Sequence, residues 1–275
     1  MKKCCVALTG AVGLLGTGLF LIAPGPGKRK EFAPFYCRNV AHRGLYEANQ
    51  TIPENSLTAF DRAASAGYGI ELDLQLSADG RVVVFHDDTL DRMCGVQGNV
   101  NDYTLTELRA MRLAGTDEQI PLFSEVLLHV AGRVPMIVEL KSGTHNEELC
   151  EKAWKQLEAY RGEFCVESFD PRIVKWFRKQ VPHVVRGQLA CRYGSYKGNL
   201  SAPVRFLFSR GLANWMGRPD FIAYQVGKKP VTVRLAEKLG AYAVCWTSHD
   251  PENEKHYETV IFEHYLPKVW YNQKS

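Results

Sequence analysis

Short apolar runs recur between residues 39 and 246, and they alternate with segments in which apolar residues return every three or four positions. The runs are typical of buried strands, and the wider spacing is typical of helices that pack on one side. We predict strands at residues 39–42, 70–76, 81–86, 136–140, 164–167, 184–189, 221–225 and 243–246. We predict helices at residues 56–66, 104–111, 123–130, 147–160, 171–180 and 231–239.

This alternation indicates an α/β fold with a parallel sheet. About eight strand–helix units over about 240 residues fit a closed (β/α)8 TIM barrel. The alternative is an open, doubly wound sheet, but the chain contains no G-x-G-x-x-G or Walker-type phosphate loop that would support it. Residues 191–218 fit neither pattern, and we expect them to form an insertion above the barrel.

The second and third predicted strands are separated only by residues 77–80, and Asp79-Gly80 is a hairpin signal. Counting outward from this turn places Asp73 opposite His86. If the two segments are instead parallel barrel strands, both still end at the same rim. Either arrangement brings the acidic residue and the histidine together.

An uncharged segment runs from Cys4 to Ala23, and about 20 apolar residues span a bilayer as a helix. We favour a retained transmembrane or signal-anchor helix over a cleaved signal peptide, whose apolar core usually has about 7–15 residues. Basic residues stand on both sides of the run, so the positive-inside rule assigns no orientation. We therefore expect residues 1–31 to be an anchor and basic linker at a membrane, and residues 32–275 to be the barrel.

The formal net charge of +4 is confined to the N-terminus. Residues 1–31 contain five basic residues and one acidic residue, whereas the remaining chain contains 29 of each. A neutral domain argues against a general nucleic-acid-binding surface, so we expect no nucleic-acid partner.

Carboxylates end two of the predicted strands. Glu71 and Asp73 point to the same side of one strand, and Glu139 lies near the end of another. Barrel active sites lie at this end of the strands, and carboxylate oxygens suit Mg²⁺ or Ca²⁺. We predict a hydrolytic site with a divalent cation, although a solvent-facing strand edge is the alternative for Glu71 and Asp73.

Histidines and basic residues end strands in the same way. His42 closes the strand before Arg43, and His86 closes a strand too apolar to be exposed. Histidine exchanges protons near neutral pH, and arginine offers a planar fork suited to phosphate. Lys141 shares a strand face with Glu139 and could neutralise a phosphate oxygen.

The sequence allows two interpretations at each of two further positions. Glu54 precedes the first helix, where it is either part of a structural turn or close enough to reach the rim. Trp246 ends the last predicted strand, where it either walls a substrate pocket or belongs to the core.

Taken together, these segments resemble the glycerophosphodiester phosphodiesterase family, within the PI-PLC-like phosphodiesterases. The matching segments, in family order, are AHRG (41–44), PENS (53–56), ELDLQLSADG (71–80), VVVFHDD (82–88), IVELK (137–141), ESFDP (167–171) and CWTSHDPE (245–252). The resemblance implies a (β/α)8 barrel that hydrolyses phosphodiesters of glycerol with a divalent cation. The family's closing strand is replaced here by TVIFEHYLP (259–267), and residues 191–218 replace the region that usually bears leaving-group contacts.

The resemblance also implies roles for the candidate residues. His42 and His86 are similar to the family's acid/base pair. The implied metal ligands are Glu71, Asp73 and Glu139, and the implied contacts to phosphate or glycerol are Arg43, Lys141 and Glu54.

The expected reaction releases glycerol 3-phosphate and an alcohol from a small glycerophosphodiester. One alternative is a lysophospholipase D-like reaction on a membrane lysolipid, which the apolar N-terminus and the aromatic segment at residues 206–215 would suit. The other alternative is a non-catalytic binding protein on the same barrel, but none of the implied catalytic or metal residues is missing.

Overall fold

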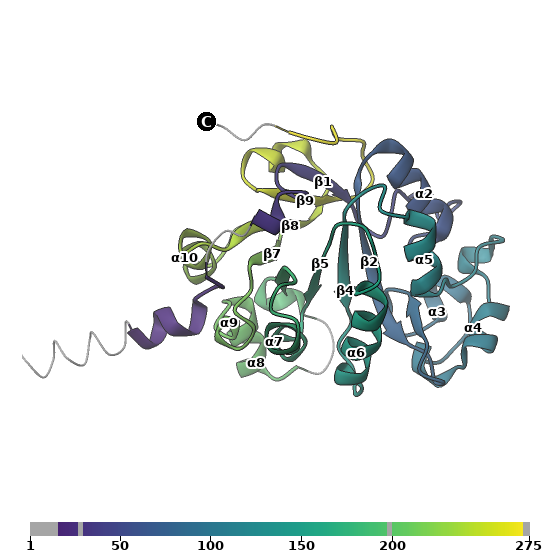
Figure 1. Ribbon diagram of the computed structural model, residues 1–275, viewed down its shortest axis with the longest axis horizontal. Coiled ribbons are helices and arrows are strands. Elements are labelled where there is room, and N and C mark those ends of the chain that lie inside the picture. The colour runs from purple at the N-terminus through teal and green to yellow at the C-terminus, as the bar shows by residue number, and fades with distance from the viewer. Residues whose placement is uncertain (1–15, 27–29, 197–199, 272–275) are drawn as a thin grey trace, which may run out of the picture.

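A computed structural model describes residues 16–26, 30–196 and 200–271, and within these ranges eight parallel strands close into a barrel (Figure 1). The barrel strands follow the order of the chain, and the first, β1, pairs with both the second and the last. The predicted TIM barrel is therefore confirmed. Its strands are β1 (Arg38–Ala41), β2 (Gly69–Leu76), β4 (Met136–Leu140), β5 (Phe164–Ser168), β6 (Arg186–Ala190), β7 (Phe221–Gln225), β8 (Tyr242–Ser248) and β9 (Thr259–Phe262).

Helices follow most strands and cover the outside of the barrel (Figure 1). The α-helices are α2 (Leu57–Ala66), α3 (Asp91–Cys94), α4 (Leu105–Ala110), α5 (Phe123–Val130), α6 (Asn146–Leu157), α7 (Pro171–Gln180), α8 (Ala202–Ser209), α9 (Asn214–Gly217) and α10 (Val231–Lys238). The 3₁₀ turns are η1 (Lys30–Phe32), η2 (Val100–Asp102), η3 (Leu113–Gly115), η4 (Tyr193–Ser195) and η5 (Pro251–Lys255). Side-chain caps explain where several begin: Ser56 caps α2, and Thr104 forms a capping box with Glu107 at α4.

The third predicted strand does not belong to the barrel. Strand β3 (Val82–Val84) pairs antiparallel with β2 and forms the hairpin that the sequence allowed. The predicted pairing of Asp73 with His86 is wrong by one residue, since the Phe85 amide donates to the Asp73 carbonyl. The cause is the turn, where the Ser77 amide bonds to the Arg81 carbonyl and leaves three residues in the loop.

The segment that departs from the family's usual closing strand closes this barrel nonetheless. Strand β9 pairs with β8 on one side and with β1 on the other. The predicted insertion after β6 is present, but it is not free of regular structure, since it contains η4, α8 and α9.

The predicted membrane anchor falls mostly on residues 1–15, which lie outside the described residues. Residues 16–22 are helical, and Ile22 at the end of this helix is buried with Ala190 and Tyr224. None of the helices in the described part of the chain has the length and apolar character needed to cross a membrane.

Candidate active site

Alternation along the barrel strands places apolar side chains in the lower barrel and polar side chains at its mouth. Ile137 of β4 belongs to the apolar cluster inside the barrel, and Glu139, two residues later, points the same way. On the last strand, Ile261 belongs to the same cluster, and Glu263 follows at the same spacing. The carboxyl ends of the strands therefore surround a polar, largely buried site.

Three of the predicted residues form a tight carboxylate cluster. Glu71, Asp73 and Glu139 are all buried, and each offers a ligand atom within 4.8 Å of the others. Strand register explains their proximity, because Asp73 of β2 is the direct partner of Glu139 on β4. The solvent-facing alternative for Glu71 and Asp73 is excluded.

A fourth carboxylate, Glu167, lies in the same row, since the register of β4 and β5 pairs it with Glu139. Burial raises the pKa of Glu167 well above its usual value, and the nearby Glu139 and Asp73 raise it further. Sequence reasoning did not assign this residue a role, although it occupies the same position in its strand as Glu139 does in β4.

Lys141 lies over the cluster. Its Nζ atom is 2.7 Å from Oδ1 of Asp73 and 2.9 Å from Oε1 of Glu139. Burial opposes ionisation of Asp73, but Lys141, His86 and Arg43 together hold its pKa well below the usual value. Burial raises the pKa of Glu139 to about 7, against the effect of Lys141. The positive charge of Lys141 therefore offsets only part of the negative charge of the carboxylate cluster.

The cluster fits a divalent cation. Oε1 of Glu71 is buried and has no hydrogen-bond partner. Burial raises the pKa of Glu71 well above its usual value, and repulsion from Asp73, Glu139 and Glu167 raises it further. Uncompensated acidic oxygens at this separation are the ligands that Mg²⁺ and Ca²⁺ use in proteins.

His42 follows β1 and is fixed by the last strand. Its Nδ1 atom lies 2.7 Å from Oε2 of Glu263, and its Nε2 atom lies 3.9 Å from Oε2 of Glu71. Burial lowers the pKa of His42 to about 4, with Arg43 adding to the effect and Glu263 opposing it. The imidazole is therefore neutral at pH 7, with Nδ1 toward Glu263 and Nε2 toward the carboxylate cluster. Glu263 was not identified from the sequence. The signal that could have found it is its position two residues after Ile261, which places both side chains on the same face of the strand.

His86 is held in a similar way. Its Nδ1 atom lies 2.6 Å from Oδ1 of Asp87. Burial and then Lys141 lower its pKa, whereas Asp73 and Asp87 oppose the shift. Each histidine thus has its Nδ1 atom engaged by a carboxylate, which sets the ring orientation. This Asp87 contact was not foreseen.

A network of two arginines connects the two histidine segments. Arg43 donates through Nη1 to Oε1 of Glu54 at 2.6 Å, and its backbone amide donates to Oε2 of Glu71 at 3.0 Å. Arg92 donates through both terminal nitrogens to Glu54 and through Nε to Asp87 at 2.6 Å. Glu54 therefore binds two guanidinium groups, which is a more specific structural role than a turn. No pattern in the sequence pointed to Arg92, which lies on a four-residue helix.

Asn55, directly before the cap of α2, is a further polar residue of the site. Ser56 caps the helix instead, and Nδ2 of Asn55 donates to Oδ2 of Asp73 at 2.8 Å. Asn55 has a positive φ of 55°, which suits asparagine better than most residues. This backbone turn aims the amide at the carboxylate cluster.

Trp246 is half-buried at the mouth of the barrel. Its indole Nε1 donates to the Ala223 carbonyl at 3.0 Å, and its ring meets Phe169 edge-on at 5.3 Å. The side chain packs against the inner core, as one interpretation of the sequence expected, and it remains partly exposed. A role as the wall of a substrate pocket stays a prediction.

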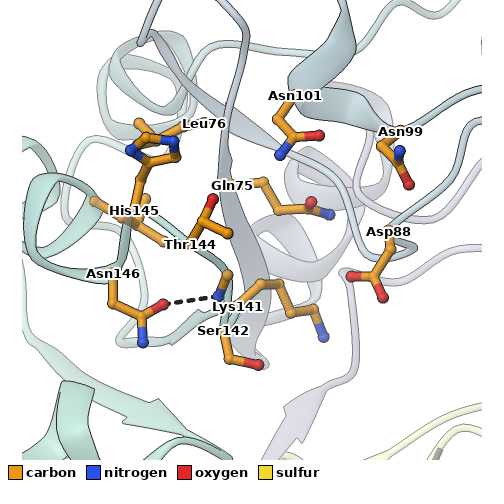
Figure 2. A pocket seen from close by; sticks show the side chains of 12 residues that line it. Gln75, Leu76, Asp88, Asn99, Asn101, Lys141, Ser142, Thr144, His145 and Asn146 are labelled. Carbon is orange, nitrogen blue, oxygen red and sulfur yellow. Dashed lines mark hydrogen bonds between the residues drawn. The ribbon is translucent and has the colours of Figure 1, made fainter. Parts of the chain in front are cut away.

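A cavity of about 350 Å³ adjoins Lys141 (Figure 2). Its wall combines the ends of β2 and β4, the loop before α6, and the segment that follows β3. The lining includes Gln75, Asp88, Asn101, Lys141, Thr144 and His145. This polar space lies next to the carboxylate cluster through Lys141.

Comparison with known proteins identifies this architecture. A sequence profile of the glycerophosphoryl diester phosphodiesterase family matches residues 42–263. The chain belongs to this family. The matched range begins at His42 and ends at Glu263, so it contains every barrel-mouth residue described above.

Two relatives of the family illustrate the extent of the similarity. A glycerophosphodiester phosphodiesterase of Caldanaerobacter subterraneus is 35% identical over 163 residues, which cover 54% of this chain and 65% of that protein. A lysophospholipase D of Rattus norvegicus is 32% identical over 165 residues, which cover 55% of this chain and 51% of that protein. The chain thus spans between half and two thirds of the length of these relatives.

Solved structures show the same fold. A phosphodiesterase of Oleispira antarctica in complex with the product sn-glycerol-3-phosphate superposes with a TM-score of 0.69 at 21% identity, covering 84% of this chain and 94% of that one. At this identity the likeness concerns the barrel alone, and it agrees with the family match.

Proposed function

We propose that this phosphodiesterase hydrolyses glycerophosphodiesters to glycerol 3-phosphate and an alcohol. The observation that carries the proposal is the buried cluster of Glu71, Asp73 and Glu139 beside two oriented histidines. The family match supports it, as does the relative that was solved with sn-glycerol-3-phosphate.

Glu71, Asp73 and Glu139 would hold a divalent cation, Mg²⁺ or Ca²⁺, which supplies positive charge for the phosphoryl oxygens. Arg43 and Lys141 add cationic groups on the same side of the barrel mouth and bind the phosphate. Glu54 keeps the Arg43 side chain in place through the 2.6 Å contact, so we assign it a positioning role toward the phosphate and glycerol.

His42 and His86 move the protons. One imidazole accepts the proton of the nucleophile through Nε2. Water as the nucleophile gives glycerol 3-phosphate directly, whereas the neighbouring glycerol hydroxyl gives a cyclic phosphate that a water molecule must then open. The other imidazole donates a proton to the alcohol oxygen as its bond to phosphorus breaks. Glu263 and Asp87 hold Nδ1 of each ring, so that Nε2 is the atom available for transfer.

A second candidate substrate is a lysolipid. A row of aromatic rings leads away from Trp246 at the barrel mouth through Phe169 to Tyr196, with ring centroids 5.3 Å and 6.1 Å apart. An acyl chain could lie along such a row, whereas a small soluble diester needs only the polar cavity beside Lys141. We infer a lysophospholipase D-like activity as the alternative.

We also propose that the chain is attached to a membrane through its N-terminus. The support is the uncharged run from Cys4 to Ala23, which is followed by the basic Lys28-Arg29-Lys30. Selective solubilisation by detergent, compared with extraction by alkaline carbonate, tests this attachment. Release of the chain by carbonate alone would contradict it.

A product assay tests the reaction. The full chain is incubated with glycerophosphocholine, glycerophosphoethanolamine, glycerophosphoinositol and lysophosphatidylcholine, with and without Mg²⁺ or Ca²⁺. We expect glycerol 3-phosphate from the soluble diesters, and lysophosphatidic acid with choline if the lysolipid is also a substrate. Asp73→Asn is a nearly isosteric control that removes one cluster charge. Equal product formation by this variant, or none by the parent chain with either cation, would reject the proposal.

A further inference from the structure

The insertion between β6 and β7, residues 191–218, exposes several large apolar side chains. On α8, Phe206 is 45% exposed and Leu207 is 42% exposed, and Trp215 on α9 is 41% exposed. Tyr193 and Leu200 are exposed in the same insertion. Each of these side chains is therefore partly exposed to solvent among the described residues of the insertion.

The same insertion is strongly basic. It contains Arg192, Arg205, Arg210 and Arg218 together with a lysine, and no aspartate or glutamate. The guanidinium carbon of Arg210 lies 4.0 Å from the centre of the Phe206 ring, and that of Arg205 lies 5.1 Å from the centre of the Tyr193 ring. An apolar helix face flanked by arginines is typical of helices that lie in a membrane interface. Because residues 32–275 are neutral as a whole, this concentration of charge is local.

The described end of the N-terminal apolar run contacts this insertion. The ring of Phe20 stacks on Trp215 at 6.2 Å, and Arg218 donates through Nη1 to the carbonyls of Phe20 and Ala23. In Figure 1 the helix at residues 16–22 lies beside α9, which follows α8 after a short turn. An apolar run that enters a bilayer would therefore place the insertion next to the lipid headgroups.

The aromatic row joins the insertion to the barrel mouth. From Trp246 and Phe169 it continues to Tyr196, whose ring lies 6.4 Å from that of Phe208 on α8. Phe208 is half-buried under the exposed face of the same helix. Packed rings thus connect α8 with Trp246 at the barrel mouth.

We propose that α8 docks the barrel on an anionic lipid bilayer, with Phe206 and Leu207 inserted among the lipids and Arg205 and Arg210 against acidic headgroups. The aromatic row then leads from the lipid surface to the phosphodiester site. The docking itself does not depend on the proposed hydrolysis.

The test measures the depth of α8 in vesicles directly, so that attachment through the N-terminus does not obscure it. Full-length Phe206→Trp is mixed with vesicles of phosphatidylcholine and phosphatidylserine, with and without bromine on the acyl chains. The matched control is Leu128→Trp, because Leu128 on α5 is 80% exposed on another helix. We expect bromine to quench Phe206→Trp fluorescence clearly more than that of Leu128→Trp, after subtraction of the parent chain. Equal quenching would overturn the proposal.

Charge variants test the choice of lipid. In the Phe206→Trp background, Arg205→Gln with Arg210→Gln should weaken docking on phosphatidylserine vesicles about fivefold for each charge removed. The control Arg161→Gln, at an exposed position outside the insertion, should leave docking unchanged. Equal effects of the two changes would overturn the headgroup assignment.

Two further readouts separate the possible failures. Self-association through α8 would appear in sedimentation velocity as an oligomer that Phe206→Ser with Leu207→Ser dissolves, and such an oligomer without quenching would overturn docking. Hydrolysis of a soluble glycerophosphodiester is measured on the same samples. Absence of that activity in the parent chain would reject the proposed reaction. The difference in quenching between Phe206→Trp and Leu128→Trp would still test the docking.

Discussion

Nδ1 of His42 lies 2.7 Å from Oε2 of Glu263, although the two residues are 221 positions apart in the chain. The contact determines which imidazole nitrogen is free, and Nε2 accordingly faces Glu71. Tyr46 donates its hydroxyl to the same Glu263 oxygen at 2.8 Å, so the carboxylate is itself held in place. Burial opposes ionisation of Glu263, but His42 and Tyr46 lower its pKa to about 2, so it is charged at any working pH.

We predict that Glu263→Gln lowers kcat/KM roughly 10- to 100-fold, as for other groups that orient a functional imidazole. In the parent chain, Glu263 raises the pKa of His42 against the lowering that burial causes. Removing its negative charge should therefore lower the pKa of His42 further. If neutral His42 is the active form, the acid limb of the pH profile moves to lower pH. The measurement is kcat/KM against pH, with the exposed Glu252→Gln as the control. An acid limb that moves upward would contradict the assignment.

Replacing either histidine should remove proton transfer. We expect His42→Ala and His86→Ala each to lower kcat about 10²- to 10⁴-fold, the usual contribution of a general acid or base. His129→Ala on α5 is the matched control, since His129 contacts only Asp61 among the described acidic residues. Steady-state kinetics is compared with thermal unfolding of the same samples. Turnover near the parent value in either active-site variant, with an unchanged fold, would exclude that histidine from the mechanism.

Chelation should stop the reaction, and a divalent cation should restore it. We expect EDTA to abolish turnover and Mg²⁺ or Ca²⁺ to recover it. Calorimetric titration should give roughly tenfold weaker cation binding, or more, for Glu139→Gln. The control Glu158→Gln, at an exposed position outside the carboxylate cluster, should bind the cation as the parent does. Full activity in chelator would remove the cation from the proposal.

Without a cation, the buried charge of Glu71 should cost stability. Its pKa in the folded chain is raised well above the usual value, chiefly by burial. A group whose folded pKa is raised binds more protons in the folded state, so its contribution to stability falls as pH rises from the unfolded pKa. In chelator, we predict that Glu71→Gln is more stable than the parent at pH 8 and that the difference shrinks toward pH 4. Denaturant unfolding at both pH values measures it, and a difference that grows on acidification would refute the argument.

The turn after His42 depends on a glycine. Gly44 has a φ of +82°, and an added Cβ would lie 2.9 Å from the Ala59 carbonyl carbon. Gly95 also has a positive φ, of +67°, but nothing lies within 4 Å of its Cβ position. Gly44→Ala should therefore lower the free energy of unfolding by about 1–3 kcal/mol more than Gly95→Ala. Chemical denaturation compares the two variants, and equal losses would show that backbone strain alone limits the position.

Periodicity predicted seven of the eight barrel strands, because apolar residues recur along each of them, but it did not predict β9. It was not sufficient where pairing depends on loop length. The hairpin of β2 and β3 has three residues in its loop, so Asp73 pairs with Phe85. A two-residue turn at Asp79-Gly80 would have paired Asp73 with His86. No sequence pattern distinguishes these two turns.

The site was predictable where polar residues end apolar strands, as at Asp73 and Glu139. Its supporting residues were harder to find. Glu263 follows a four-residue strand whose role as the closing strand becomes clear only through its pairing with β1. Arg92 contacts Glu54, which is 38 positions away in the chain. It also contacts Asp87, which is close in sequence but lies outside any strand. Such contacts depend on tertiary structure, so local patterns do not record them.

Closure of the barrel by the pairing of β9 with β1 has a consequence for biosynthesis. During translation, His42 leaves the ribosome 221 positions before the carboxylate that orients it. A polypeptide that stops short of β9 would contain Glu71, Asp73 and Glu139 but would lack the carboxylate that orients His42. The orientation of His42 is therefore completed only once the barrel has closed.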